Sequence, residues 1–198
     1  MPEPESSKLT SEQQAVREDI VRQTGLNPEC LEILTIPLTA WPEGISAYYL
    51  VRKDRHGRIF YNYVCFDGEV YSPFTPDGLD RLLVRLLSSR RFTLTGEQLA
   101  NILLMYKRPE PLMTLITDFK QDIALSSQEA LDMYYDLSDF TPQLTKLEED
   151  HKLVFWTLNI RWELLKRWTA YITAEGRVRL IEDIKINLRD ARAGQETI

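Results

Sequence analysis

The residue types that most often carry out catalysis are few in this chain of 198 residues. It has only two histidines, and His56 lies in a predicted turn while His151 follows a run of acidic residues. Carboxylate neighbours could make either histidine a zinc ligand, but adjacent residues of an extended chain point apart and no ligand pair has the spacing of a zinc site. We interpret both as solvated turn residues and expect no metal or other cofactor. The sequence leaves open only whether His56 and His151 lie close together in the folded chain.

Nucleophile and nucleotide motifs are also missing. Neither Cys30 nor Cys65 has a recognisable histidine partner, and no serine lies in a Gly-x-Ser-x-Gly elbow. The eight glycines never form a Gly-x-Gly-x-x-Gly loop. Cys65 lies in an apolar and aromatic run, which indicates a buried free thiol rather than a disulfide. The sequence leaves the question of an enzyme open and favours a protein without catalytic activity.

Charge is distributed unevenly along the chain. Residues 81–108 contain six basic residues and one acidic residue, whereas residues 118–151 contain nine acidic residues and two lysines. On a predicted helix, Arg81 and Arg85 are one turn apart and opposite a leucine stripe. Such a distribution could form a docking surface of mixed sign or a nucleic-acid-binding patch, although two solvated helix faces that attract each other would give the same pattern. The candidate binding residues on this basic surface are Arg81, Arg85, Arg90 and Arg91.

Aromatic residues provide the second candidate site. Trp162 and Tyr171 lie in a predicted strand meander, and aromatic residues with polar tips often line pockets in curved sheets. Packing of the same residues against helices is the competing interpretation. If the sheet encloses a cavity, we expect Trp162, Arg161 or Tyr171 beside it. Trp162 and Arg161 point to opposite faces of a strand, so only one of the two can line a cavity.

The elements that must position these residues are clearest near the C-terminus. Apolar residues occupy every second position from Val154 to Leu164 and alternate with polar ones. A period of two predicts a half-buried strand, here over residues 152–164 with Trp162 inside it. Further strands over 166–173 and 177–187, joined by a turn at 174–176, complete an antiparallel meander.

The N-terminal part predicts a helix and a similar meander. The helix begins at Thr10 or Ser11, where Ser11 and Gln14 fit a capping box, and ends at Gly25. A short strand is expected within residues 31–38. Hairpin strands follow at 45–53 and 58–66, then a short strand at 69–72 after the Asp-Gly turn at 67–68.

The middle of the chain changes to a helical period. Leucine stripes and Ser/Thr or Asp starts predict helices over residues 77–88, from 95 to the prolines at 109 and 111, and over 126–137. Residues 112–119 fit a helix or a strand equally well. Residues 141–150 are predicted to be a polar connection.

These elements predict an α+β fold with two antiparallel β-meanders and helices packed on them, in one sheet or two. The Gly-Arg pairs at 57–58 and 176–177 suggest a duplicated α-β-β-β unit. In broad architecture the chain resembles cystatin-like or NTF2-like folds, an analogy that implies no function. The expected segments of one compact domain are a disordered N-terminus (1–8), a helix plus first meander (9–76), a helical connection (77–125), a helix plus second meander (126–190) and a C-terminal tail (191–198).

Composition restricts the partners. The net charge of −6 disfavours nucleic acid, and neither a membrane-spanning stretch nor a signal peptide is recognisable. We therefore expect a cytoplasmic, non-enzymatic protein that binds another protein. The alternative is a small-molecule-binding protein or enzyme with an aromatic-lined pocket in a curved sheet. A homodimer through exposed strand edges stays open.

Overall fold

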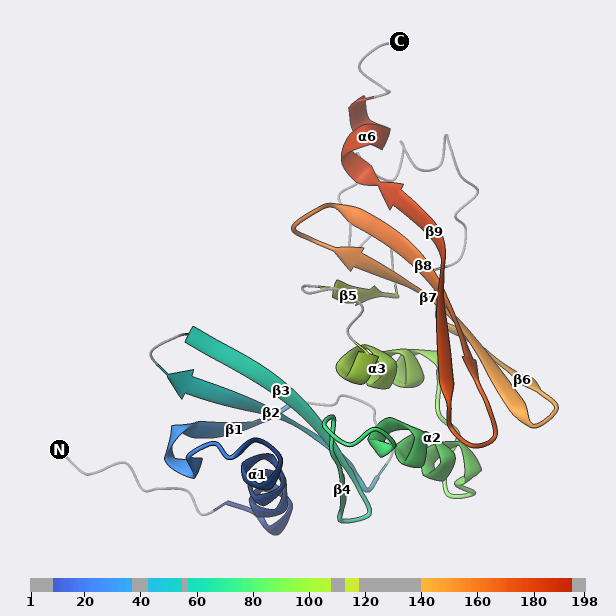
Figure 1. The fold of residues 1–198 in the computed structure, drawn as a ribbon. Coiled ribbons are helices and arrows are strands. Elements are labelled where there is room, and N and C mark those ends of the chain that lie inside the picture. The colour runs from blue at the N-terminus through green and yellow to red at the C-terminus, as the bar shows by residue number, and fades with distance from the viewer. Residues whose placement is uncertain (1–8, 37–42, 55–56, 108–112, 118–139, 194–198) are drawn as a thin grey trace. The chain divides into compact units, whose positions relative to one another are not determined.

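The computed structural model describes residues 9–36, 43–54, 57–107, 113–117 and 140–193. In these residues the chain is α+β, as predicted, and its strands form a four-stranded and a five-stranded antiparallel sheet (Figure 1). The chain divides into two compact units, Met1–Leu83 and Val84–Ile198, which are described separately below. No helix among the described residues is long and apolar enough to cross a membrane.

The first unit contains a helix and a sequential meander. Its strands are ordered β1-β2-β3-β4, and each pairs antiparallel with the next. Asp67 and Gly68 connect β3 to β4 with positive φ angles of 51° and 76°, the conformation of a type I′ hairpin turn. The elements are α1 (Ser11–Thr24), η1 (Pro28–Cys30), β1 (Leu31–Thr35), β2 (Ile45–Asp54), β3 (Gly57–Phe66) and β4 (Glu69–Tyr71).

Helix α1 begins one residue earlier than its predicted capping box. Thr10, not Ser11, is the N-cap, and its hydroxyl accepts a hydrogen bond from the Gln13 amide while the Gln13 side chain accepts one from the Thr10 amide. The box predicted between Ser11 and Gln14 is therefore wrong by one position. Gly25 ends the helix with a φ of 69°, as predicted.

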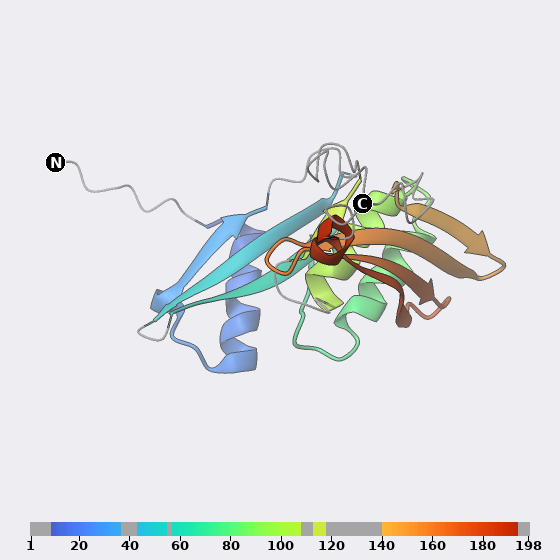
Figure 2. The same cartoon turned by 90° about the horizontal axis from the view of Figure 1, so that it is seen from above.

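The core of the first unit lies between α1 and one face of its sheet. Figure 2 shows α1, drawn in blue, lying across the strands. Its residues Val16 and Ile20 are fully buried. On the sheet they meet four side chains on the same face of β2 and β3, two of which, Tyr48 and Tyr63, are directly opposite each other. The four are Tyr48, Leu50, Tyr63 and Cys65.

Helix α2 (Gly78–Ser88) confirms the predicted leucine-rich helix and spans the boundary between the units. Its leucines Leu79, Leu82, Leu83 and Leu86 are buried. Its first residue must be small, because a Cβ on Gly78 would lie 2.2 Å from the Ser72 carbonyl oxygen.

In the second unit, two short strands lie one after the other along the same edge of the longer strand β7. β5 pairs with the C-terminal part of β7, from Trp156 to Asn159, and β6 pairs with its N-terminal part, from Asp150 to Val154. β8 and β9 continue the sheet on the other side of β7. The elements are α3 (Gly96–Lys107), β5 (Met113–Ile116), β6 (Gln143–Leu147), β7 (Asp150–Asn159), β8 (Leu164–Ile172), β9 (Val178–Asn187) and α6 (Leu188–Ala193).

Several predictions for this unit need correction. Residues 143–147, predicted as part of a connection, form strand β6, because Glu148 adopts a φ of 52° and turns the chain directly into β7. The ambiguous segment 112–119 contains strand β5. The predicted helix over 126–137 lies outside the described residues, as do the turn residues 55–56.

The predicted strand over 152–164 is too long. β7 ends at Asn159, whose side-chain oxygen accepts a hydrogen bond from the Trp162 amide at 3.2 Å, and Glu163 has a φ of 51°. This side-chain hydrogen bond stabilises a turn over residues 160–163, which the prediction had placed in the strand. Ile160 and Trp162 are consequently 66% and 46% exposed rather than buried on the predicted face.

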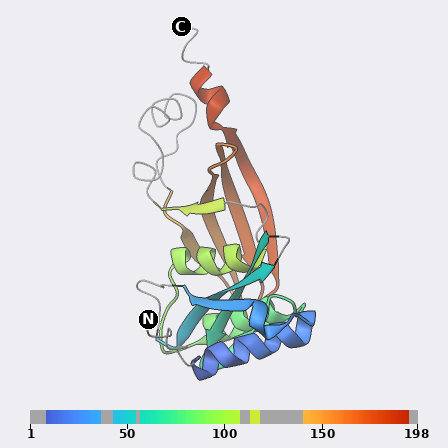
Figure 3. The same cartoon turned by 90° about the vertical axis from the view of Figure 1, so that its left-hand side faces the viewer.

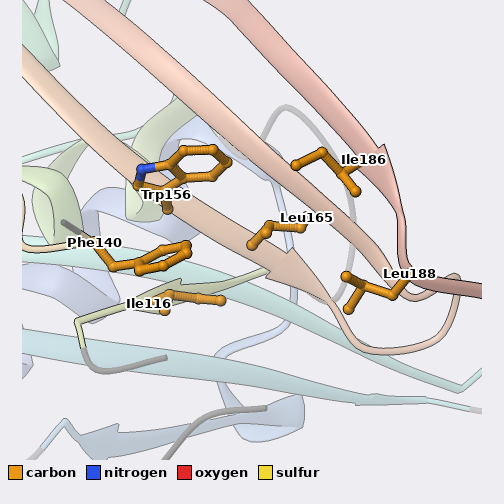
Figure 4. Packing of buried hydrophobic residues seen from close by; sticks show 6 residues of the cluster. All are labelled: Ile116, Phe140, Trp156, Leu165, Ile186 and Leu188. Atoms are coloured by element: carbon orange, nitrogen blue, oxygen red, sulfur yellow. The ribbon is translucent and has the colours of Figure 1, made fainter. Parts of the chain in front are cut away.

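An apolar cluster fills one end of the second sheet (Figure 4). The rings of Phe140 and Trp156 pack at a centroid distance of 5.1 Å, and Ile116 of β5 belongs to the same cluster. Its other members are Leu165, Ile186 and Leu188. Helix α3 contacts β5, β6 and β7, and a Cβ on its first residue, Gly96, would lie 2.2 Å from the Pro142 carbonyl oxygen.

Candidate functional site

The arginines of the basic surface are largely engaged within the fold. Arg81 forms an ion pair with Glu69, and its guanidinium lies 5.8 Å from the centre of the Tyr71 ring. Arg85 and Arg91 also take part in interactions of the folded chain. Arg90 is exposed. Arg81 and Arg85 lie on helix α2, Arg81 in the first unit and Arg85, Arg90 and Arg91 in the second.

Trp162 and Tyr171 lie at opposite ends of β8. Trp162 is in the turn before the strand, and Tyr171 is its next-to-last residue. At about 3.4 Å per residue, the two are separated by more than 20 Å along the strand. Arg161 is exposed beside Trp162, and its carbonyl accepts a hydrogen bond from Arg189 at 3.4 Å. The structure therefore does not bring Trp162 and Tyr171 together around one pocket.

Tyr171 instead belongs to a groove at the end of the β8–β9 hairpin. The groove has a volume of about 460 Å³, and Tyr171 is 40% exposed. Strand β8, the hairpin turn and the first residues of β9 form it. Its lining residues are Tyr171, Thr173, Arg177, Val178, Arg179 and Ile181.

The register of the sheet places Tyr171 between two cations. Lys152 of β7 is directly opposite Tyr171 on one side, and Arg179 of β9 is directly opposite it on the other. Directly paired residues lie on the same face with Cβ atoms about 5 Å apart. We call these three residues the cation–tyrosine row. In the part of the chain that the structure describes, neither Lys152 nor Arg179 forms an ion pair.

One carboxylate lies near the mouth of the groove. Glu175 of the hairpin turn accepts a hydrogen bond from the Thr173 hydroxyl at 2.8 Å. This hydrogen bond, together with the charge of Arg177, lowers the pKa of Glu175 below its ordinary value. Among the described residues, Glu175 thus has a hydrogen-bond partner within the hairpin turn, and Arg179 has no ion-pair partner.

The opposite face of the same strands carries a closed polar network. Lys166 is buried, and its ammonium lies 2.6 Å from Glu182 and 5.6 Å from the centre of the Trp168 ring. The Trp168 indole N–H donates to the Thr157 hydroxyl at 2.8 Å. Because these groups satisfy one another, we assign them to the stability of the sheet.

A second groove lies on the outer side of α1. Its volume is about 540 Å³, and both charge signs line it, with Arg17 and Arg22 beside Glu18 and Glu29. Arg17 donates to the Pro28 carbonyl at 2.7 Å, and Arg22 lies 2.5 Å from Asp19. These arginines already have partners in the first unit, so the groove is the weaker candidate.

Three of the residues considered above for catalysis lie among the described residues: Cys30, Cys65 and His151. Burial, together with the charge of Lys146, lowers the pKa of His151 below its ordinary value. Burial raises the pKa of the Cys65 thiol to about 12, which keeps it protonated and unreactive. Among the described residues, no group of histidine, cysteine and acidic side chains could hold a metal ion.

Comparisons with models of protein families, with curated proteins and with solved structures found no match. The likeness to cystatin-like and NTF2-like folds therefore stays an analogy.

Sequence reasoning named Tyr171 but missed its neighbours in space. Lys152, Arg177 and Arg179 were not recognised as part of a site. The alternation along β9 places Arg179 and Ile181 on one face, and this signal is visible in the sequence. Their position beside Tyr171 depends on the register across the β8–β9 turn, which periodicity does not fix.

Proposed function

We propose that this chain is a non-enzymatic cytoplasmic protein that binds another protein through the open face of its second sheet around Tyr171. The observation that carries the proposal is the cation–tyrosine row, in which an exposed aromatic ring lies between two cations that form no ion pair with any described residue. Tyrosine and arginine are among the residues that most often anchor protein interfaces.

The exposure of the groove favours a macromolecular partner. Tyr171, Arg177 and Arg179 are all exposed, whereas a small-molecule site covers most of the surface of its ligand. A partner protein could cover the row and its surroundings together. The basic surface is a weaker basis for binding because Arg81 already pairs with Glu69.

A matched pair of double variants tests the proposal. After the native partner has been identified by affinity recovery, its affinity is measured for Tyr171→Ala with Arg179→Ala and for Trp162→Ala with Arg161→Ala. Both changes remove one aromatic side chain and one arginine from the same sheet, at opposite ends of β8. We expect the first to weaken binding at least tenfold and the second to leave it unchanged. Equal effects of the two changes would exclude the open face as the binding surface.

A small-molecule-binding protein or enzyme is the second candidate. The groove volume of about 460 Å³ lies within the range of ligand pockets. Native mass spectrometry of the purified protein would support this function if it detects a bound metabolite that Tyr171→Ala removes. A metabolite that Tyr171→Ala retains would exclude this groove as its site.

A further inference from the structure

The groove lies beside an exposed sheet edge. β9 is the last strand in the order β5-β7-β8-β9 and is drawn in red at one edge of the sheet in Figure 3. Within the described residues, no strand pairs with its outer side. Such an edge presents backbone N–H and C=O groups that can pair with another extended chain.

A bulge limits the regular part of this edge. Arg167 pairs with Ile184 while Trp168 pairs with Glu182, so Asp183 is an extra residue in β9. The carboxylate of Asp183 accepts a hydrogen bond from the Thr169 hydroxyl. A bulge twists the strand and interrupts its pairing. The stretch 178–182, next to the groove, is therefore the part of the edge that can accept another strand in regular register.

The charges around residues 178–182 determine which kind of chain can pair with this edge. Two arginines and no carboxylate line the groove itself, and Lys152 adds a third cation on the same face. The carboxylates of Glu175 and Asp183 flank it, and each accepts a hydrogen bond from a threonine hydroxyl. Arg179 and Ile181 lie on this face of β9, with Tyr171 beside them. An added strand would thus place alternate side chains against a surface that is cationic and partly apolar.

We propose, on the basis of the function above, that the partner supplies an extended acidic segment that adds as a strand to the outer edge of β9 along residues 178–182. Its backbone pairs with the edge, its carboxylates lie against Arg177 and Arg179, and an apolar side chain packs on Tyr171 and Ile181. In strand addition, main-chain hydrogen bonds supply affinity and alternate side chains supply specificity.

Fluorescence anisotropy with synthetic peptides tests this inference. The probe is a fluorescein-labelled heptapeptide, Glu-Thr-Glu-Thr-Val-Thr-Glu, whose odd positions present three glutamates and one valine to the same face. The matched peptide has lysine in place of glutamate. At low salt we expect only the acidic peptide to bind, and Arg179→Glu to weaken it at least tenfold. Arg161→Glu, an exposed change in the β7–β8 turn, serves as the charge-matched control and should leave the affinity unchanged.

Backbone methylation separates strand addition from docking through side chains alone. A strand presents the N–H groups of alternate residues to one neighbour, so N-methylation of one alternate set should abolish binding and methylation of the other should preserve it. Equal binding of both methylated peptides would contradict strand addition. So would equal binding of the acidic and lysine peptides, or no binding of the acidic peptide at millimolar concentration.

Three further outcomes separate this inference from the proposed function. If the chain sediments as a dimer that Arg179→Glu dissociates, a second copy occupies the edge and the acidic-strand proposal is wrong. If the peptides fail while the native partner still depends on Tyr171 and Arg179, only strand addition is excluded. If changing Tyr171 and Arg179 leaves the affinity for the native partner unchanged, the proposed binding surface itself is wrong.

Discussion

The two units share an order of elements but build their outer strand differently. Each has a helix followed by an antiparallel meander, and in the first unit the outer strand β1 is continuous. In the second unit β5 and β6 share that position along one edge of β7. The difference shows that a meander keeps its register when its outer strand is interrupted, because the neighbouring strand supplies hydrogen bonds to both parts.

The two units also differ in which elements their buried polar side chains connect. In the first unit Asp19 of α1 accepts a hydrogen bond from the Tyr63 hydroxyl at 3.1 Å and forms an ion pair with Arg22. Burial opposes ionisation of Asp19, but hydrogen bonds from Ser72, Arg22 and Tyr63 outweigh it and lower its pKa. In the second unit the buried polar contacts run between strands, from Lys166 to Glu182 and from Trp168 to Thr157.

The shared order bears on the duplication hypothesis. Gly57 begins β3, the third strand of the first meander, whereas Gly176 precedes β9, which occupies the fourth strand position of the second. If the two meanders are aligned from their outer strands, the two Gly-Arg pairs differ by one strand position. A duplicated unit stays a hypothesis that now rests on the order of elements.

The largest difference is expected between two tryptophans of the second unit. Trp156→Ala removes a ring that is 5% exposed and should lower the free energy of unfolding by about 3–5 kcal/mol. Trp162→Ala, at 46% exposure, should change it by less than about 0.5 kcal/mol. Urea unfolding followed by circular dichroism measures both. Similar losses would mean that the β7–β8 turn contributes to the core.

Gly96→Ala tests the close contact between the first residue of α3 and the backbone of Pro142, which directly precedes β6. Its Cβ would lie 2.2 Å from the Pro142 carbonyl oxygen, so the backbone must move, and we expect a loss of about 3 kcal/mol. Gly25→Ala is the control, since it has open space and only a φ of 69° to oppose it, which costs about 1 kcal/mol. Thermal unfolding of the two variants compares them. A loss at Gly96 no larger than that at Gly25 would contradict the close contact.

Asp19→Asn is expected to change the acid stability of the first unit. Because the folded pKa of Asp19 is lowered, its ionised form contributes stability above its ordinary pKa of 3.8, and that stability is lost as the pH falls through the folded value. The variant should therefore be less stable by about 1–2 kcal/mol at pH 7 and approach the parent protein below about pH 4. Urea unfolding between pH 7 and pH 3 measures the difference, with Glu18→Gln on the same helix as the control. A difference that does not vary with pH would exclude ionised Asp19 as its cause.

Labelling of the Cys65 thiol should report opening of the first unit separately from opening of the second. The variant used for it should have nearly the same stability as the parent protein. Both cysteines lie in the first unit, and Cys65 is fully buried while Cys30 is exposed. In a Cys30→Ser variant, whose stability should change by less than about 0.5 kcal/mol, the Cys65 thiol reports opening of the first unit alone. Trp156, Trp162 and Trp168 report mainly on the second. Labelling of Cys65 as fast as that of Cys30 in the parent protein would contradict its burial.

The sequence predicted the elements whose signals are local. The Asp-Gly turn at 67–68, the leucine stripe of α2 and the glycine that ends α1 each specify a structure within a few residues. Period-two alternation likewise predicted the C-terminal meander, but the alternation continues past the end of the real strand. The strand stops at Asn159 because the Asn159 side chain accepts a hydrogen bond from the Trp162 amide and so stabilises a turn instead.

The remaining features depend on contacts distant in sequence. Strand β6 is polar and mostly exposed, so alternation could not reveal it, and its pairing partner β7 determines its conformation. The groove around Tyr171 depends on the register of three strands. Arg81, which the sequence placed on a free basic face, pairs with Glu69 of a distant strand.

The division of the outer strand position also suggests an order of folding. The β6–β7 hairpin closes through a turn at Glu148 and can form quickly, whereas β5 pairs with residues of β7 that are roughly forty positions away. We expect the β6–β7–β8 hairpins to form first and β5 to join last. Ile116 would then complete the apolar cluster only at the end of folding, when β5 covers this end of the sheet.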